Sequence, residues 1–180
     1  MLSCCGGHKG GETVFRNVKL MVISALMVAL VTVFTILIRI PIPGTQGYIH
    51  IGDVMIYSSS ILVGNPAAFV IGGLGSAIAD LLYYPHYALP TFIIKGIMGL
   101  ITARILYRAN GTLSMGRVVV AMVAGGVWMC VGYFIYETIV YGLAYGLAGI
   151  GFNILQSLGG AALTLPFIRT LLKLKDNLKK

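Results

Sequence analysis

The sequence predicts an all-α integral membrane protein with six transmembrane helices in a compact bundle and both termini in the cytoplasm. Three observations predict this class. Of the 180 residues, 58% are hydrophobic and only 10% are charged, which leaves too little polar surface for a soluble domain of this size. Apolar stretches recur along the chain at about the length that a bilayer requires. All Lys and Arg residues except Arg39 and Lys95 fall on one side of the predicted topology, as cytoplasmic loops require.

The chain divides into three parts by composition. Residues 1–17 predict a disordered cytoplasmic head, residues 18–172 a six-helix membrane domain, and residues 173–180 a basic cytoplasmic tail. Breaks rich in proline and glycine separate the helices, among them "RIPIPGTQGYIHIGD", "PHYALP" and "YGLAYGLAG". The second helix is too short to cross a bilayer unaided. The predicted helices cover 18–38, 54–63, 67–84, 91–107, 118–140 and 150–172.

Composition and motifs argue against several classes of function. A net charge of +8 is typical of nucleic-acid binding, but no basic patch alternates with aromatic residues here, and cations collect on the cytoplasmic side of membrane helices. Cys4, Cys5 and Cys130 have neither a metal-ligand spacing nor a disulfide framework. The sequence contains no ATP-binding P-loop and no G-x-S-x-G motif. We therefore expect no metal site, no nucleic-acid partner and no cofactor in this chain.

One charge lies inside the fourth predicted helix. Lys95, in "LPTFIIKGIMGLI", is about 6 to 8 Å below the outer start of that helix at 1.5 Å per residue. A charge at this depth is costly, so we expect Lys95 to pair with an acidic residue or to meet a ligand. Asp80 is the first candidate partner, followed by Asp53 and Glu137. Asp53 and Asp80 are accordingly predicted to be structural, although Asp53 could also cap the second helix.

The remaining polar side chains of the membrane domain fall in its outer half. Asn153 and Gln156 share one helix face, where they could bind a ligand or form hydrogen bonds between helices. Tyr133 and Glu137 share a face of the fifth helix, where they could line a pocket for an aromatic ligand or belong to an interfacial aromatic belt. The candidate ligand-binding residues are Tyr48, His50, Lys95, Tyr133, Glu137, Asn153 and Gln156.

The first helix carries a pair of small residues. Ala25 and Ala29, in "SALMVAL", are four apart, so one face of the helix presents only methyl groups and another helix can approach it closely. Packing within the bundle would explain the same pair.

Three stretches, taken in order, carry a resemblance to a known family. They are "ALMVA", "GYIHIGDVMIYSSSILVGNPAAFVIGGLGSAIADLL" and "PTFIIKGIMGL". Over residues 18–172 the chain resembles the substrate-binding S components of energy-coupling factor (ECF) vitamin transporters, especially the group that contains the riboflavin-type S components.

The resemblance implies a multi-pass binding protein of the bacterial cell membrane and not an enzyme. Such a protein captures a small vitamin or precursor, such as riboflavin, pyridoxine or a thiamine-precursor pyrimidine, in an outer-half pocket. The family builds this pocket from the loop after the first helix and from helices four to six, and Lys95 lies within the matching "TFIIKG". Ala25 and Ala29 would dock on a shared transmembrane coupling protein, and two ATPase subunits would use the ATP.

Two alternatives remain open at this point. Asp53 and Asp80 could form the carboxylate pair of a small intramembrane enzyme, which predicts that they approach within hydrogen-bonding reach. A stand-alone transporter or channel would move its substrate without partner chains or ATP, but the two halves of the sequence show no convincing inverted repeat.

Overall fold

The computed structural model describes residues 18–41, 48–108 and 114–178, and it is a helical bundle. Within these residues five helical segments are long and apolar enough to cross a membrane, which supports the predicted membrane class. Helix α3, with 11 residues, is too short to do so, as the sequence predicts. The elements are α2 (Val18–Leu37), β1 (Arg39–Pro41), β2 (Tyr48–His50), α3 (Gly52–Leu62), α4 (Asn65–Tyr83), α5 (Pro85–Tyr107), α6 (Met115–Tyr141), α7 (Leu143–Thr164), η1 (Leu165–Phe167) and α8 (Ile168–Leu178).

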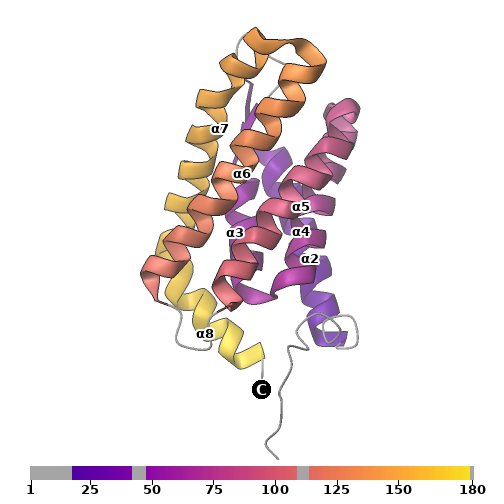
Figure 1. The fold of residues 1–180 in the computed structure, drawn as a ribbon. Helices are drawn as coiled ribbons and strands as arrows, with labels where there is room; N and C mark the ends of the chain where they lie inside the picture. Colours follow the sequence, from indigo (N-terminus) through magenta and orange to yellow (C-terminus); the bar gives the residue numbers. More distant parts are fainter. Residues whose placement is uncertain (1–17, 42–47, 109–113, 179–180) are drawn as a thin grey trace, which may run out of the picture.

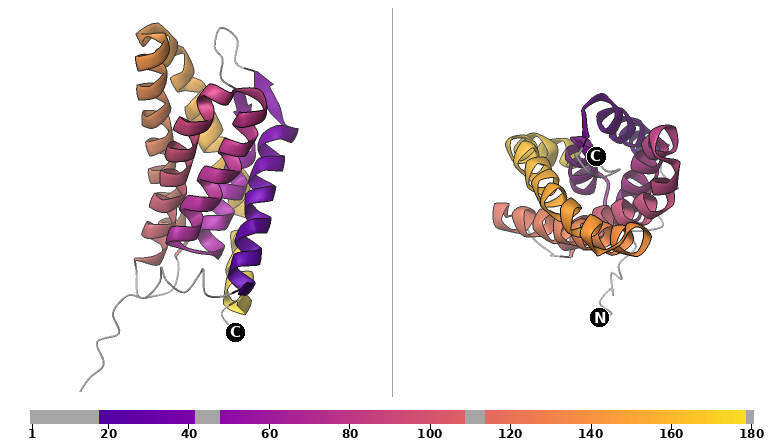
Figure 2. Two further views of the ribbon diagram at one scale, coloured as in Figure 1. Left: turned by 90° about the vertical axis from the view of Figure 1, so that its right-hand side faces the viewer. Right: turned by 90° about the horizontal axis from the view of Figure 1, so that it is seen from above.

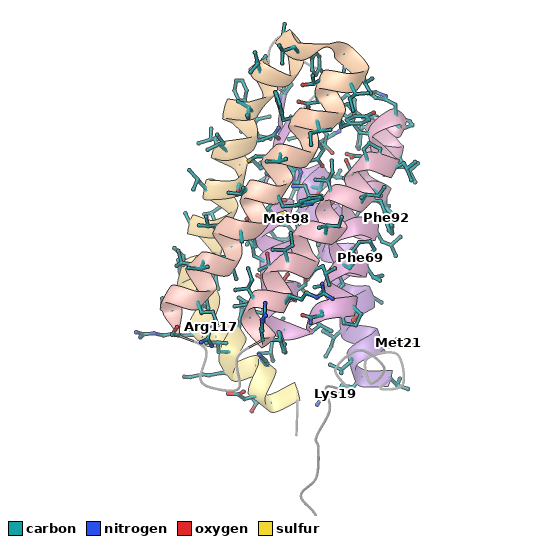
Figure 3. The ribbon with its side chains drawn as sticks, in the orientation of Figure 1. Lys19, Met21, Phe69, Phe92, Met98 and Arg117 are labelled. Carbon is teal, nitrogen blue, oxygen red and sulfur yellow. The ribbon has the colours of Figure 1, made fainter. Side chains whose placement is uncertain are left out.

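The long helices run between two distinct ends of the bundle (Figure 1). The start of α2 and the whole of α8 lie at one end, called the inner end below, and the strands and the α6–α7 turn lie at the other, called the outer end (Figures 1 and 2). The side chains of Lys19 and Arg117 also lie at the inner end (Figure 3). The predicted head, residues 1–17, lies outside the described residues. Helix α8 runs across the boundary predicted at residue 173 between the membrane domain and the tail. The cytoplasmic location of the termini stays a prediction.

Neighbouring helices follow the order α2, α4, α5, α6 and α7, and α3 packs against α2, α4, α5, α7 and α8. All residues of α3 except Met55 are buried. The buried serine hydroxyls of α3 are satisfied locally, since Ser58 donates to the Val54 carbonyl at 2.7 Å and Ser60 to the Ile56 carbonyl at 2.9 Å. The amphipathic helix α8 packs against α3, with Ile168 buried. Helix α3 is thus enclosed by other helices. The space between its N-terminal end and the strands is available for a pocket.

Helix α5 begins six residues before its predicted start, so the prediction that "PHYALP" separates two helices is wrong. Pro85 occupies the first turn, where a missing N–H costs nothing. Pro90 lies inside the helix and leaves the His86 carbonyl without its usual intrahelical donor. The Tyr136 hydroxyl from α6 donates to that carbonyl at 2.9 Å. A contact between helices therefore replaces the lost bond.

Helix α7 likewise begins well before residue 150, and the prediction of a turn over "YGLAYGLAG" is wrong. The reversal is confined to Gly142, whose φ of 94° lies in the region that favours glycine. The other glycines in this stretch are helical. Gly146 instead allows close packing, because a Cβ there would lie 3.2 Å from the Phe134 carbonyl oxygen of α6.

Helices α4 and α5 are in close backbone contact. A Cβ at Gly72 would lie 2.7 Å from the Lys95 carbonyl oxygen, and one at Gly73 would lie 2.7 Å from that of Phe92. The ring of Phe92 meets that of Phe69 edge-on at 5.5 Å, and both side chains can be followed in Figure 3. Small residues at such positions let two membrane helices approach each other. This contact fixes the place of Lys95 beside α4.

Gly72→Ala should therefore destabilise the protein, because the new methyl group forces α4 away from the backbone at Lys95. We expect a loss of about 1–3 kcal/mol in the free energy of unfolding, measured by denaturant titration in detergent. Gly151→Ala is the matched control, since nothing lies within 4 Å of its added Cβ and alanine is the better helix former. Equal stability of the two variants would contradict the close contact.

Candidate functional site

A fully buried ion pair joins the start of α3 to α5. The Lys95 ammonium donates to Asp53 at 2.5 Å, and both side chains are 0% exposed. Lys95 also contacts the Met129 sulfur at 2.8 Å and lies 5.7 Å from the centroid of the Tyr133 ring. The prediction that Asp80 is the first partner is wrong, because the Tyr48 hydroxyl engages that carboxylate instead. The charge inside the helix is thus matched by an acid from the short helix.

Gln156 of α7 connects this ion pair to strand β2. Its amide nitrogen donates to the second Asp53 oxygen at 3.0 Å, and its amide oxygen accepts from the His50 backbone N–H at 3.2 Å. The side chains of Lys95 and Gln156 together satisfy both oxygens of the buried carboxylate. Three helices and one strand therefore converge on Asp53.

His50 is held as a neutral imidazole. Burial, together with the positive charge of Lys95, lowers the pKa of His50 to about 3, so the ring is uncharged at pH 7. Its Nδ1 accepts from the Gly52 backbone N–H at 3.1 Å, which places the proton on Nε2. The neighbour of Nε2 is the amide nitrogen of Gln156 at 3.4 Å, which has no lone pair to accept that proton. The Nε2–H group is therefore available to donate a hydrogen bond to a ligand.

A small pocket opens at the outer end, above the ion pair. Its volume is about 40 Å³, room for no more than a few water molecules. Lys95 is not among its lining residues, whereas the other six predicted ligand-binding residues are. Those six are Tyr48, His50, Tyr133, Glu137, Asn153 and Gln156. Five further residues line the pocket that were not predicted from the sequence to do so: Thr35, Ser76, Asp80, Tyr87 and Thr91.

Three buried polar atoms of the pocket lack a hydrogen-bond partner within the described residues. They are the hydroxyl oxygens of Thr35 and Ser76 and one carboxylate oxygen of Glu137. The other Glu137 oxygen accepts from the Tyr87 hydroxyl at 3.4 Å. Buried polar groups are normally paired, so unpaired ones in a pocket indicate the positions where a ligand binds. The pocket offers hydroxyl donors on one wall and a carboxylate acceptor on another.

The sequence did not point to Thr35 by charge, because α2 carries no charged residue near that position. One signal existed for Thr35, which follows the other two buried residues of α2, Met27 and Val31, at steps of four. A hydroxyl on the buried stripe of an otherwise apolar helix is a candidate for a polar contact. Ser76 had a signal of its own, because it precedes Asp80 by four residues in α4 and so shares its helix face.

Two tyrosines that line the pocket, Tyr48 and Tyr87, contact further aromatic rings. The Tyr48 ring stacks on Tyr84 at 5.3 Å, and the Arg39 guanidinium lies 3.4 Å from the centroid of the Tyr83 ring. Tyr141 stacks on Tyr145 at 4.5 Å and lies next to Tyr87. Flat ring surfaces of this kind suit a planar ligand.

Ala25 and Ala29 lie on the outward face of α2, and both are exposed. Only 17% of the apolar window of this helix is buried, and its contacts run through Met27, Val31 and Thr35 on the opposite face. The alanines therefore do not pack inside this chain, which removes the alternative of internal packing and leaves their face available to a partner.

A sequence model of the ECF-type riboflavin transporter S component family matches residues 15–173. The chain belongs to this family. It is therefore a component of a transporter and not an enzyme, with a substrate-binding role in vitamin uptake, and the family implies association with other ECF transporter components. The alternative of an intramembrane enzyme is wrong, and Asp53 and Asp80 indeed have different partners.

Two relatives of this S component span most of its length. The thiamine precursor transporter HmpT of Lactococcus lactis subsp. cremoris (strain MG1363) is 32% identical over 151 residues, which cover 82% of this chain and 84% of the relative. An uncharacterized protein of Pyrococcus woesei is 40% identical over 130 residues, which cover 72% of this chain and 86% of that protein. The two comparisons name different ligands: the family description names riboflavin, and the name of HmpT refers to a thiamine precursor.

Replacing Lys95 with Met should destabilise this S component by about 3–5 kcal/mol, because it leaves the Asp53 charge buried and unpaired. Combining Lys95→Met with Asp53→Asn should recover most of that loss, since a neutral pair needs no counter-charge. Unfolding in detergent measures both variants. A double variant as unstable as the single one would show that the ion pair is not what Lys95 contributes.

Proposed function

We propose that this S component captures a compact aminopyrimidine precursor of thiamine in its outer pocket. The Glu137 oxygen that lacks a partner among the described residues, in a pocket that Thr35 and Ser76 also line, carries the proposal. The protein would cross the bacterial cell membrane several times and deliver its ligand with a shared transmembrane coupling protein and two ATPase subunits. Those subunits would use the ATP, and this chain would hold no cofactor.

The hydrogen-bonding capacity of the pocket suits such a ring. An exocyclic amine would donate to the Glu137 oxygen that lacks a hydrogen-bond partner among the described residues. Ring nitrogens would accept from His50 Nε2–H or from the hydroxyls of Thr35 and Ser76. Flat aromatic neighbours such as Tyr133 and Tyr87 would cover the ring faces. Each unpaired group would thereby gain a partner that water otherwise supplies.

Size also favours a compact ligand. A cavity of about 40 Å³ is far below the roughly 300–1,000 Å³ of typical ligand pockets. Lining side chains must move to admit even one ring, and the movement required grows with ligand size. Riboflavin, with three fused rings and a polyol chain, is the second candidate because the family description names it. The likeness to the thiamine precursor transporter supports the smaller ring.

Lys95 would act through its neighbours. It holds Asp53, which orients the Gln156 amide, which in turn fixes the His50 backbone at the pocket wall. Lys95 is therefore proposed as a positioning residue beneath the ligand that pairs with an acidic residue and does not meet the ligand itself.

Glu137→Gln should weaken binding of the aminopyrimidine by about tenfold or more, or 1.4 kcal/mol, because it replaces one carboxyl oxygen with an amide NH2 group that cannot accept a hydrogen bond. Calorimetry on purified protein gives the affinity, and Asp176→Asn on exposed α8 is the matched control. Mass spectrometry of the small molecule that co-purifies identifies the natural ligand. Tighter binding of riboflavin than of the aminopyrimidine, or an unchanged affinity of the Gln variant, would overturn the ligand assignment.

Replacing both Ala25 and Ala29 with Leu should abolish co-purification with the coupling protein while ligand binding persists. Bulky side chains keep a second helix from approaching this face. Ala144 and Ala148 on α7 are the matched control, because they are also exposed and four residues apart. Their double Leu variant should assemble normally. Normal assembly and uptake by the α2 variant would refute docking through this face.

A further inference from the structure

A second recess lies at the inner end of the bundle, where α4 begins and α5 ends. It has a volume of about 360 Å³ and is lined by Asn65, Arg104, Ile105 and Arg108. Arg104 and Arg108 are four residues apart, so their side chains leave α5 on the same face. The recess is larger than the outer pocket and is separated from it by the length of both helices.

The two arginines have no acidic partner among the described residues. Neither forms an ion pair with any residue in the described ranges, and both are exposed. Asp53, Asp80 and Glu137 lie in the outer half, and Asp176 on α8 forms no ion pair with either arginine in the described residues. The Asn65 side-chain oxygen, by contrast, is buried at the recess with no hydrogen-bond partner in the part of the chain that the structure describes. The recess therefore combines two cationic donors with one unpaired acceptor.

An apolar stripe of α5 continues from the arginines toward the outer end. Ile93, Ile97 and Leu100 precede Arg104 at steps of three or four residues, so they lie on nearly the same helix face. Ile93 is 46% exposed, and Ile97 and Leu100 are partly exposed. A cationic site at the end of a spanning helix with an apolar strip above it matches a phospholipid, whose headgroup and acyl chain lie in that order.

We propose that this recess binds the headgroup of an anionic phospholipid of the inner leaflet, with phosphatidylglycerol as the best fit. The guanidinium groups of Arg104 and Arg108 donate to the phosphate oxygens, a pairing that planar guanidinium groups make well. A headgroup hydroxyl donates to the Asn65 oxygen. The first acyl carbons contact Ile105, and the chain follows the α5 stripe. This site is independent of the vitamin ligand and of the coupling-protein face.

The test is native mass spectrometry of the detergent-purified protein after addition of phosphatidylglycerol or phosphatidylcholine. The wild-type protein should retain phosphatidylglycerol in preference to the net-neutral lipid. Arg104→Gln with Arg108→Gln should lower its occupancy by about tenfold or more, at roughly 1 kcal/mol for each cation lost. Arg169→Gln with Lys173→Gln is the matched control, because it removes two exposed cations, also four residues apart, from α8. The control should bind as the wild type does.

A second variant keeps the test decisive if the double Gln variant folds poorly. Asn65→Asp places a carboxylate at the first turn of α4, which the helix tolerates well, yet repels a phosphate. It should lose phosphatidylglycerol while its unfolding midpoint without lipid stays unchanged. Retention by Asn65→Asp or by the double Gln variant, or equal loss in the α8 control, would overturn the proposal. Inorganic phosphate that raises the unfolding midpoint as much as the lipid would likewise show a phosphate ion site instead.

Discussion

The structure depends on the ion pair of Lys95 and Asp53, because an unpaired charge in the interior of a membrane bundle would be the most costly group in the molecule. Lys95 is fixed along α5 by the backbone contact with Gly72 of α4. Its carboxylate partner must then lie at the same depth, which sets the height at which α3 begins. Gln156 satisfies the second Asp53 oxygen and so ties α7 to the same point. The register of four helices thus follows from the requirement to neutralise one ammonium group.

The same requirement creates the pocket. Because α3 starts at Gly52, directly before Asp53, no helix of the described residues fills the space between the ion pair and the outer strands. Strand β2 covers that space and places Tyr48 and His50 on its wall, through its pairing with β1 in the register Arg39 with His50. A longer α3 would have filled the volume with its own side chains. The short helix therefore supplies the floor of the site as well as the partner of the lysine.

The features that could be predicted from the sequence are those that depend on a single helical segment. Helix lengths and the depth of Lys95 follow from local apolarity and from 1.5 Å per residue. The acidic partner of Lys95 could not be predicted in this way, because Asp53 and Asp80 both lie in the outer half. Only the three-dimensional packing shows that the Tyr48 hydroxyl donates to the Asp80 carboxylate. The early start of α5 was hidden for a similar reason, since Pro90 reads as a break until the Tyr136 hydroxyl is seen to replace the lost bond.

The positions of the buried polar atoms without hydrogen-bond partners distinguish the polar groups that stabilise the bundle from those that could bind a ligand. Polar groups at mid-depth are paired: the Tyr57 hydroxyl donates to the Met122 carbonyl at 3.1 Å and the Thr102 hydroxyl to that of Met98 at 2.9 Å. Within the described residues, the buried side-chain atoms without partners belong to the two end regions, including Glu137 on the outer side and Asn65 on the inner side. A bilayer interior supplies no water to satisfy such atoms, whereas each end borders an aqueous or headgroup phase that carries ligands. Unused hydrogen-bonding capacity at Glu137 and Asn65 therefore lies where a molecule from outside the chain can take it up.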